Sequence, residues 1–117
     1  MRESEQARLA VRFYSTASGS EPVREWLVEL SRGDRRAVGE DIKTVQLGWP
    51  LGMPLVRKLE PNLWEVRVDL KDGIARVLFT TVGAAMVLLH GFIKKSQQLP
   101  PADLALARSR MKEVRHG

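Results

Sequence analysis

The sequence predicts an α+β domain in which a small antiparallel sheet carries a helical hairpin on one face and is followed by a C-terminal helix. Three observations predict this class: strand-like patterns over residues 56–93, two amphipathic helical patterns before them, and one after them. The expected order is strand, two helices, four strands and a last helix. We expect one domain over residues 1–117, with residues 1–7 as a disordered tail.

A first strand is expected over residues 8–14, where apolar side chains recur with a period of two. The first helix follows, with Ser20 as its cap and Pro22 in its first turn. Its apolar face is formed by Val23, Trp26, Leu27 and Leu30. After a break, Asp34 is expected to cap a second helix that runs to about Leu47. The apolar stripe of that helix is Val38, Ile42 and Val45.

The clearest strands are residues 63–69 and 74–81, which a hairpin turn at Asp72-Gly73 joins. In the first of them, one face is apolar, with Trp64, Val66 and Val68. The opposite face is charged, with Glu65, Arg67 and Asp69. Residues 56–60 predict a shorter strand. Residues 84–93 are almost continuously apolar, so we expect a central strand that is covered on both faces.

The last helix is expected to begin at Pro101 or Ala102, because the two prolines at positions 100 and 101 end the sheet. One side of this helix is apolar and is lined by Leu104, Ala107, Met111 and Val114.

The net charge, the lack of cysteine and the absence of long apolar runs restrict the classes of function that the chain can have. The chain has a formal net charge of +5, which favours a polyanionic partner such as nucleic acid. It has no cysteine, which excludes disulfides, thiolate nucleophiles and Cys-ligated zinc. The two histidines have no metal-site spacing, so we predict neither a metal nor another cofactor. No apolar run reaches the ~20 residues of a membrane span, and we expect a cytoplasmic protein without a membrane partner.

Several segments together carry a resemblance to a known family. They are Pro22–Leu27, Gly52–Leu59, Leu63–Arg67, Ala75–Phe79 and Leu88–Ser96, followed by Pro100 and Leu104. In this order and spacing, the chain resembles the RelE/ParE toxin superfamily of bacterial type II toxin–antitoxin systems, and it looks closest to the HigB-like, phage-derived branch.

The resemblance implies a metal-independent endoribonuclease that cleaves mRNA, usually in the ribosomal A site. It also implies a cognate antitoxin, commonly a helix-turn-helix protein. Two other functions stay open. The superfamily contains toxins that poison DNA gyrase, and a non-catalytic RNA- or protein-binding module could use the same fold.

RNA cleavage by a 2′-OH requires a base, cations that stabilise the phosphorane, and an acid for the leaving 5′-oxygen. Arg76 is the first candidate for holding the phosphate, and the alternative is an ion pair with Glu65 or Asp69. Arg67 is the second candidate for holding the phosphate. Alternatively, it simply lies on a solvated strand face. Lys58 is the candidate base and Arg57 a phosphate anchor; alternatively, both protect an edge strand by their charge.

The reference pKa of the histidine side chain suits acid–base work, so His90 is a candidate for it, although a buried, hydrogen-bonded histidine is the plainer interpretation. Lys94 and Lys95 can contact RNA or the ribosome, or serve only solubility. Phe92 can stack on a base, but it supplies no phenolic proton where many relatives carry tyrosine. Trp49 is either a loop anchor or a base-stacking residue.

Overall fold

The computed structural model describes residues 8–95 and 98–116, so the tail expected over residues 1–7 lies outside the described residues. It confirms the α+β class and the predicted order of elements. The strands are β1 (Ala10–Phe13), β2 (Val56–Glu60), β3 (Leu63–Leu70), β4 (Gly73–Val82) and β5 (Ala85–Lys94). The helices are α1 (Pro22–Glu29), α2 (Arg32–Gly48) and α3 (Pro101–His116).

The five strands form one sheet in the order β1-β5-β4-β3-β2. Strands β2 to β5 are a meander of antiparallel pairs, as the hairpin signals predicted. β1 differs from the prediction of an antiparallel sheet, because it pairs with β5 in parallel. A parallel pair needs a long connection, and the whole chain between β1 and β5 supplies it. β5 therefore has a neighbour on each side, as expected for an interior strand.

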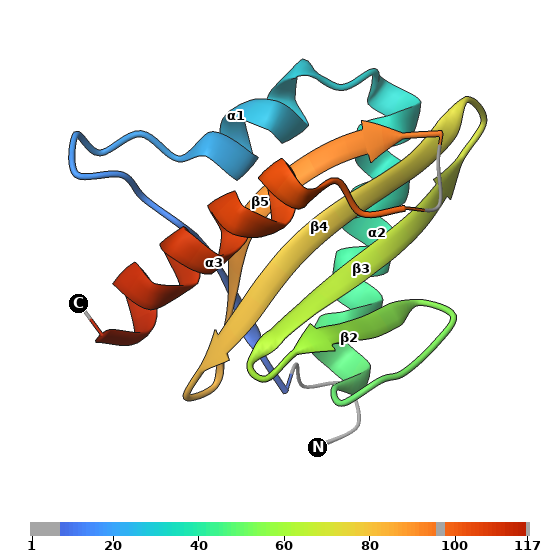
Figure 1. Cartoon of the computed structure of the whole chain (residues 1–117). Helices are drawn as coiled ribbons and strands as arrows, with labels where there is room; N and C mark the ends of the chain where they lie inside the picture. The colour runs from blue at the N-terminus through green and yellow to red at the C-terminus, as the bar shows by residue number, and fades with distance from the viewer. Residues whose placement is uncertain (1–7, 96–97, 117) are drawn as a thin grey trace.

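The helices lie on opposite faces of the sheet (Figure 1), with α1 and α2 behind it and α3 in front. Beneath α1 and α2, the buried core includes Val38, Val45, Val66, Val77, Phe79 and Leu88. Beneath α3, a second core contains Tyr14, Leu63, Leu78, Val87, Leu89, Phe92 and Ala107. We call these two sides of the sheet the hairpin face and the α3 face.

Both helix starts differ slightly from the sequence prediction. Glu21, not Ser20, is the N-cap of α1, and its side chain makes no capping hydrogen bond. The hydroxyl of Ser20 instead pairs with the Thr16 hydroxyl at 2.8 Å. In α2 the N-cap is Ser31, whose side chain accepts a hydrogen bond from the Asp34 backbone N–H at 3.2 Å. A serine oxygen caps the turn as well as an aspartate does, so α2 begins before Asp34.

A bulge in β5 decides which way His90 points. Leu78 pairs with His90, but Phe79 pairs with Leu88, so Leu89 is an extra residue without a partner on β4. Leu89 packs in the core beneath α3, and the neighbouring His90 hydrogen-bonds to α3. Two consecutive side chains therefore reach the α3 face, which regular strand alternation does not allow.

Candidate functional site

Four charged side chains from three strands meet on the α3 face. We call this set the arginine cluster, and its members are Arg57, Glu65, Arg67 and Arg76. Arg76 Nη1 lies 3.2 Å from Glu65 Oε2. Arg57 Nε and Arg67 Nε lie 3.3 Å and 3.9 Å from Glu65 Oε1. One carboxylate thus faces three guanidinium groups, and the cluster keeps an excess of positive charge.

Strand register explains why these residues meet. Arg57 on β2 pairs with Glu65 on β3, Glu65 pairs with Leu78 on β4, and Leu78 pairs with His90 on β5. The next row on the same face is Arg67, Arg76 and Phe92. Directly paired residues point to the same side of a sheet, so the two rows place the arginines, Phe92 and His90 side by side.

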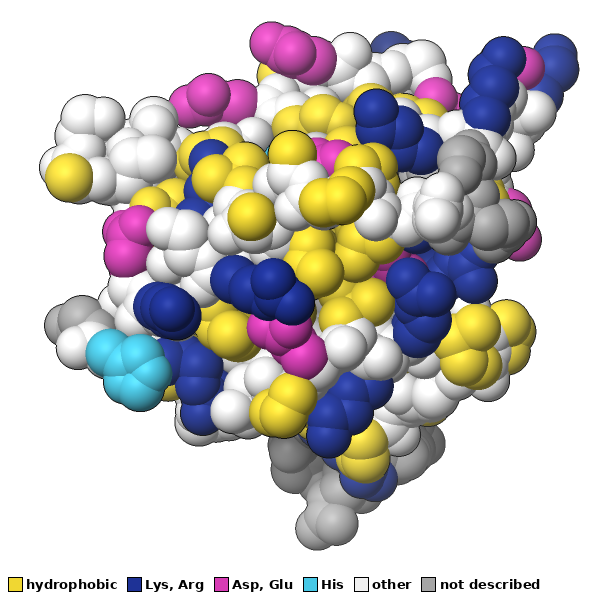
Figure 2. Space-filling view, in the orientation of Figure 1, with side chains coloured by type: hydrophobic (Ala, Val, Ile, Leu, Met, Phe, Trp, Pro, Cys, Tyr) yellow, Lys and Arg dark blue, Asp and Glu magenta, His cyan; other side chains and the backbone are white. Residues whose placement is uncertain are grey.

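The members of the cluster differ in their access to solvent. The side chains of Glu65 and Arg76 are 0% exposed, Arg67 is 19% exposed and Arg57 is 37% exposed. An anion that arrives from solvent therefore meets Arg57 and Arg67 first, with the buried pair beneath them. Figure 2 shows further Lys and Arg side chains around the apolar centre of the same side of the molecule.

Arg76 forms one of the ion pairs that the sequence left as an alternative, the one with Glu65. Its complete burial keeps its guanidinium from touching a phosphate in this conformation. Contact of Arg76 with the scissile phosphate stays a prediction. In this structure Arg76 forms an ion pair with Glu65 beneath the more exposed Arg57 and Arg67.

His90 is held from two directions. Its Nε2 lies 2.6 Å from Asp103 Oδ1 in the first turn of α3, and its side chain is 17% exposed. Its ring stacks on Phe92, with centroids 5.3 Å apart and an interplanar angle of 29°. Phe92 itself is 8% exposed and lies opposite Arg76. The predicted hydrogen bond of His90 is confirmed, and the ring also keeps a path to solvent.

Lys58 does not join the arginine cluster, and its role as the base stays a prediction. It follows Arg57 directly, and successive side chains of a strand point to opposite faces. Val56, two residues earlier on the same side as Lys58, is buried in the core of the hairpin face. Lys58 is exposed on that face, on the strand at the edge of the sheet.

Trp49 is held in place as a loop anchor, and its stacking on a base stays a prediction. It caps the C-terminus of α2 and packs against the core of the hairpin face. Its ring meets Trp64 edge-on at 5.0 Å and Phe79 at 5.5 Å between centroids. These aromatic partners hold it on the side of the sheet that the arginine cluster does not reach.

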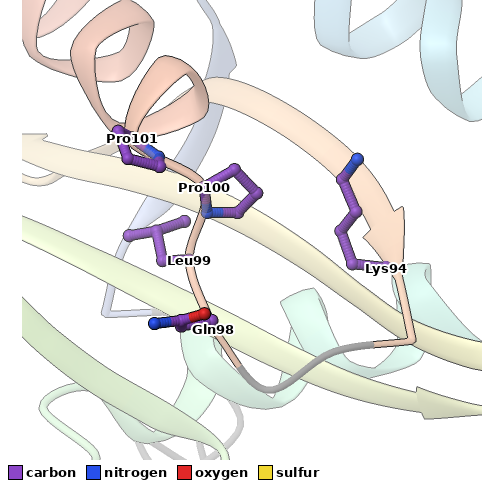
Figure 3. Close-up of a pocket in the computed structure, with 5 residues that line it drawn as sticks. All are labelled: Lys94, Gln98, Leu99, Pro100 and Pro101. Atoms are coloured by element: carbon purple, nitrogen blue, oxygen red, sulfur yellow. The ribbon is translucent and has the colours of Figure 1, made fainter.

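Lys94 and Lys95 are both exposed at the end of β5. Lys94 lines a pocket of about 480 Å³ together with Gln98, Leu99, Pro100 and Pro101 (Figure 3). The pocket lies where β5 ends and α3 begins, so Lys94 is available to an anion at this end of the sheet. Contacts of both lysines with RNA stay predictions.

Helix α3 is held on the sheet by polar contacts as well as by Ala107. Arg108 binds the Glu60 carboxylate through Nε at 2.8 Å and Nη2 at 2.7 Å. These hydrogen bonds from Arg108 lower the pKa of Glu60. Arg110 donates to the Leu89 carbonyl at 2.8 Å, and Arg115 donates to the Thr81 carbonyl at 2.6 Å.

Two members of this region were not among the candidate residues of the sequence analysis. Glu65 was considered only as a partner of Arg76, although a lone carboxylate among strand cations signals a shared counterion. Asp103 lies 13 residues after His90 and belongs to α3 rather than β5, so no sequence spacing links the two. Within residues 8–95 and 98–116, no group of three His, Cys, Asp or Glu side chains could hold a metal ion. No helix in this part of the chain is long and apolar enough to cross a membrane.

Residues 25–112 match the sequence profile of the family described as phage-derived protein Gp49-like. The chain belongs to this family. The match covers both rows of the α3 face, including the arginine cluster, His90 and Asp103. The Gp49-like family is a phage-derived, RelE-like family of toxin type, so the predicted resemblance is confirmed at that level. No curated protein matches the chain.

Proposed function

We propose that this chain is the toxin of a type II toxin–antitoxin system, of the HigB-like branch, and that it cleaves mRNA on the ribosome. The single observation that carries the proposal is the arginine cluster. Three guanidinium groups share one carboxylate on a sheet face, and two of them reach solvent. Guanidinium groups bind phosphate through paired hydrogen bonds, so this surface suits an RNA backbone.

The proposed reaction is attack of a 2′-OH on the adjacent phosphorus, with release of the 5′-oxygen. Arg57 and Arg67 hold the phosphate and stabilise the charge of the phosphorane. Arg76 and Glu65 fix these two side chains from beneath. His90, one strand away from Arg76, protonates the leaving oxygen. All of these groups are side chains of the protein, so the proposal requires no metal.

The same proposal includes two macromolecular partners. The ribosome presents the mRNA, and a cognate antitoxin, commonly a helix-turn-helix protein, blocks the toxin. The excess positive charge supports an RNA-rich partner, because cations of the protein replace the counterions of the phosphates. Lys94 and Lys95 are proposed to contact RNA beside the cluster.

The test is to map mRNA 5′ ends in a cell-free translation reaction that contains the purified protein. One reaction contains ribosomes and a matched reaction contains the same mRNA without them. New 5′ ends that require ribosomes are the expected result. Cleavage without ribosomes would indicate a free ribonuclease. An intact mRNA with a folded protein would contradict the proposal, and supercoiling assays with DNA gyrase would then test the other toxin class.

A further inference from the structure

We propose that Asp103 is a positioning residue for His90: it fixes the imidazole so that Nδ1 faces the leaving 5′-oxygen. The inference rests on the proposed function and deepens it, since it assigns a role to the start of α3. It follows from the bulge in β5, from the two contacts of the His90 ring, and from its place beside the arginine cluster.

The hydrogen bond to Asp103 distinguishes the two ring nitrogens of His90. Nε2 is engaged by Asp103 at 2.6 Å. Nδ1 has no hydrogen-bond partner in the part of the chain that the structure describes. A carboxylate on one nitrogen selects the tautomer and the orientation of the ring, and leaves the other nitrogen for proton transfer. Stacking on Phe92 fixes the plane of the ring as well.

Helix α3 forms hydrogen bonds with two residues of the bulge. Asp103 reaches His90, and Arg110 donates a hydrogen bond to the carbonyl of Leu89, the extra residue of the bulge. Asp103 and Arg110 are seven residues apart, which places them on the same side of the helix. The bulge turns His90 toward α3, and α3 then holds both the backbone and the side chain of this turn.

The ring lies close to where the phosphate would be held. Arg76 is directly opposite Phe92, so His90 is its diagonal neighbour across β4 and β5. Diagonal neighbours of an antiparallel pair are about 7–8 Å apart. A phosphate above the cluster would therefore have its leaving oxygen within reach of a ring on the adjacent strand.

The proton balance is complete with the groups named. The 2′-oxygen forms a bond to phosphorus and loses its proton to solvent or to a base, and the bond between phosphorus and the 5′-oxygen breaks. The imidazolium of His90 gives its Nδ1 proton to the 5′-oxygen. The products are a 2′,3′-cyclic phosphate and a 5′-hydroxyl. The Nε2 proton stays in the hydrogen bond to Asp103 throughout.

The experiment compares two short mRNAs on ribosomes, one natural and one with a bridging sulfur in place of the 5′-oxygen at the mapped cleavage site. A thiolate leaves without a proton, so the sulfur substrate needs no acid. We expect His90→Gln to slow cleavage of the natural mRNA by about 10²–10⁴-fold. Asp103→Asn should slow it by at least about tenfold. Both variants should cut the sulfur substrate within about twofold of the wild-type rate.

Matched controls separate positioning from folding. Asp103→Glu keeps the carboxylate and should recover part of the lost rate, and Lys43→Ala, on the exposed surface of α2, should cut both substrates normally. Nitrogen-15 NMR of the histidine rings adds a readout that needs no cleavage. We expect the Nε2–H tautomer for His90 in the wild type and a mixture in Asp103→Asn.

The outcomes are distinguishable. Equal slowing of both substrates by Asp103→Asn, or an unchanged tautomer, would overturn the positioning role and leave the proposed function standing. A wild-type protein that cuts neither substrate would overturn the proposed function and this role together.

Discussion

At the scale of single residues, Glu65 is the member on which the cluster depends most. Its carboxylate and the Arg76 guanidinium are both 0% exposed and lie 3.2 Å apart. Removing one partner of a buried ion pair leaves the other charge without compensation. We expect Glu65→Gln to lower the free energy of unfolding by about 3–5 kcal/mol, as measured by urea unfolding with tryptophan fluorescence.

The matched variant for this measurement is Arg57→Ala, which removes the most exposed partner of the same carboxylate. Exposed ion pairs contribute little, so it should lower the free energy of unfolding by no more than about 1 kcal/mol. If Glu65→Gln unfolded at the same urea concentration as the wild type, the buried charge would not be what holds the cluster together.

The sequence identified the three arginines of the cluster as candidate residues. It did not predict that Glu65 would join them or that Lys58 would not. Strand alternation placed Glu65 and Arg67 on one face, and the structure confirms it. The same rule, applied to Arg57 and Lys58, shows that only one of them could join that face. Trp49 could not be assigned in this way, because its partners Trp64 and Phe79 lie on strands far along the chain.

At the scale of elements, α1 packs very close to β5 at Gly91. A Cβ at this position would lie 2.4 Å from Cε3 of the Trp26 ring, which is nearer than side chains approach. We expect Gly91→Ala to destabilise the protein by about 1–3 kcal/mol, because the indole and α1 must shift. Thermal unfolding measures this, with Gly39→Ala as a control where a Cβ meets nothing within 4 Å. Equal losses in both variants would argue against the close contact.

The stability that the Arg108–Glu60 ion pair between α3 and β2 contributes should depend on pH. Arg108 lowers the pKa of Glu60 below its ordinary value of 4.5. The ion pair between Arg108 and Glu60 therefore contributes to stability above pH 4.5. This contribution is lost as the pH falls and Glu60 is protonated in the folded protein. We expect Arg108→Ala to be less stable than the wild type at pH 7, with the difference shrinking below pH 4.5. Urea unfolding at several pH values tests this, and a constant difference would contradict it.

The elements themselves were largely predictable, and the bulge was not. Alternation and turn residues predicted β3 and β4, and apolar spacing predicted the helices. β5 is apolar at almost every position, so its sequence has no period from which a register shift could be inferred. Without the bulge, His90 would share the hairpin face with Leu88. The position of the candidate acid thus depends on tertiary pairing with β4.

At the scale of the whole molecule, the net charge of +5 predicts salt-dependent binding of RNA. The test uses single-stranded RNA with 2′-O-methyl groups, which the protein cannot cleave by the proposed route. Each phosphate contact adds about 0.7 to the slope of log K against log salt. We expect Arg57→Ala to reduce the slope by about that amount, and Lys43→Ala, on the other face, to leave it nearly unchanged. Identical slopes would indicate that the α3 face does not bind RNA.

The measurement that tests the central claim most directly compares Arg57→Ala with Lys58→Ala in the translation reaction that maps mRNA 5′ ends. These two cations are neighbours on β2 and point to opposite faces of the sheet. If the arginine cluster holds the phosphate, Arg57→Ala loses most of the ribosome-dependent cleavage, and Lys58→Ala cuts at the same sites as the wild type. Loss of cleavage in Lys58→Ala with normal cleavage in Arg57→Ala would place the reaction on the hairpin face and contradict this account.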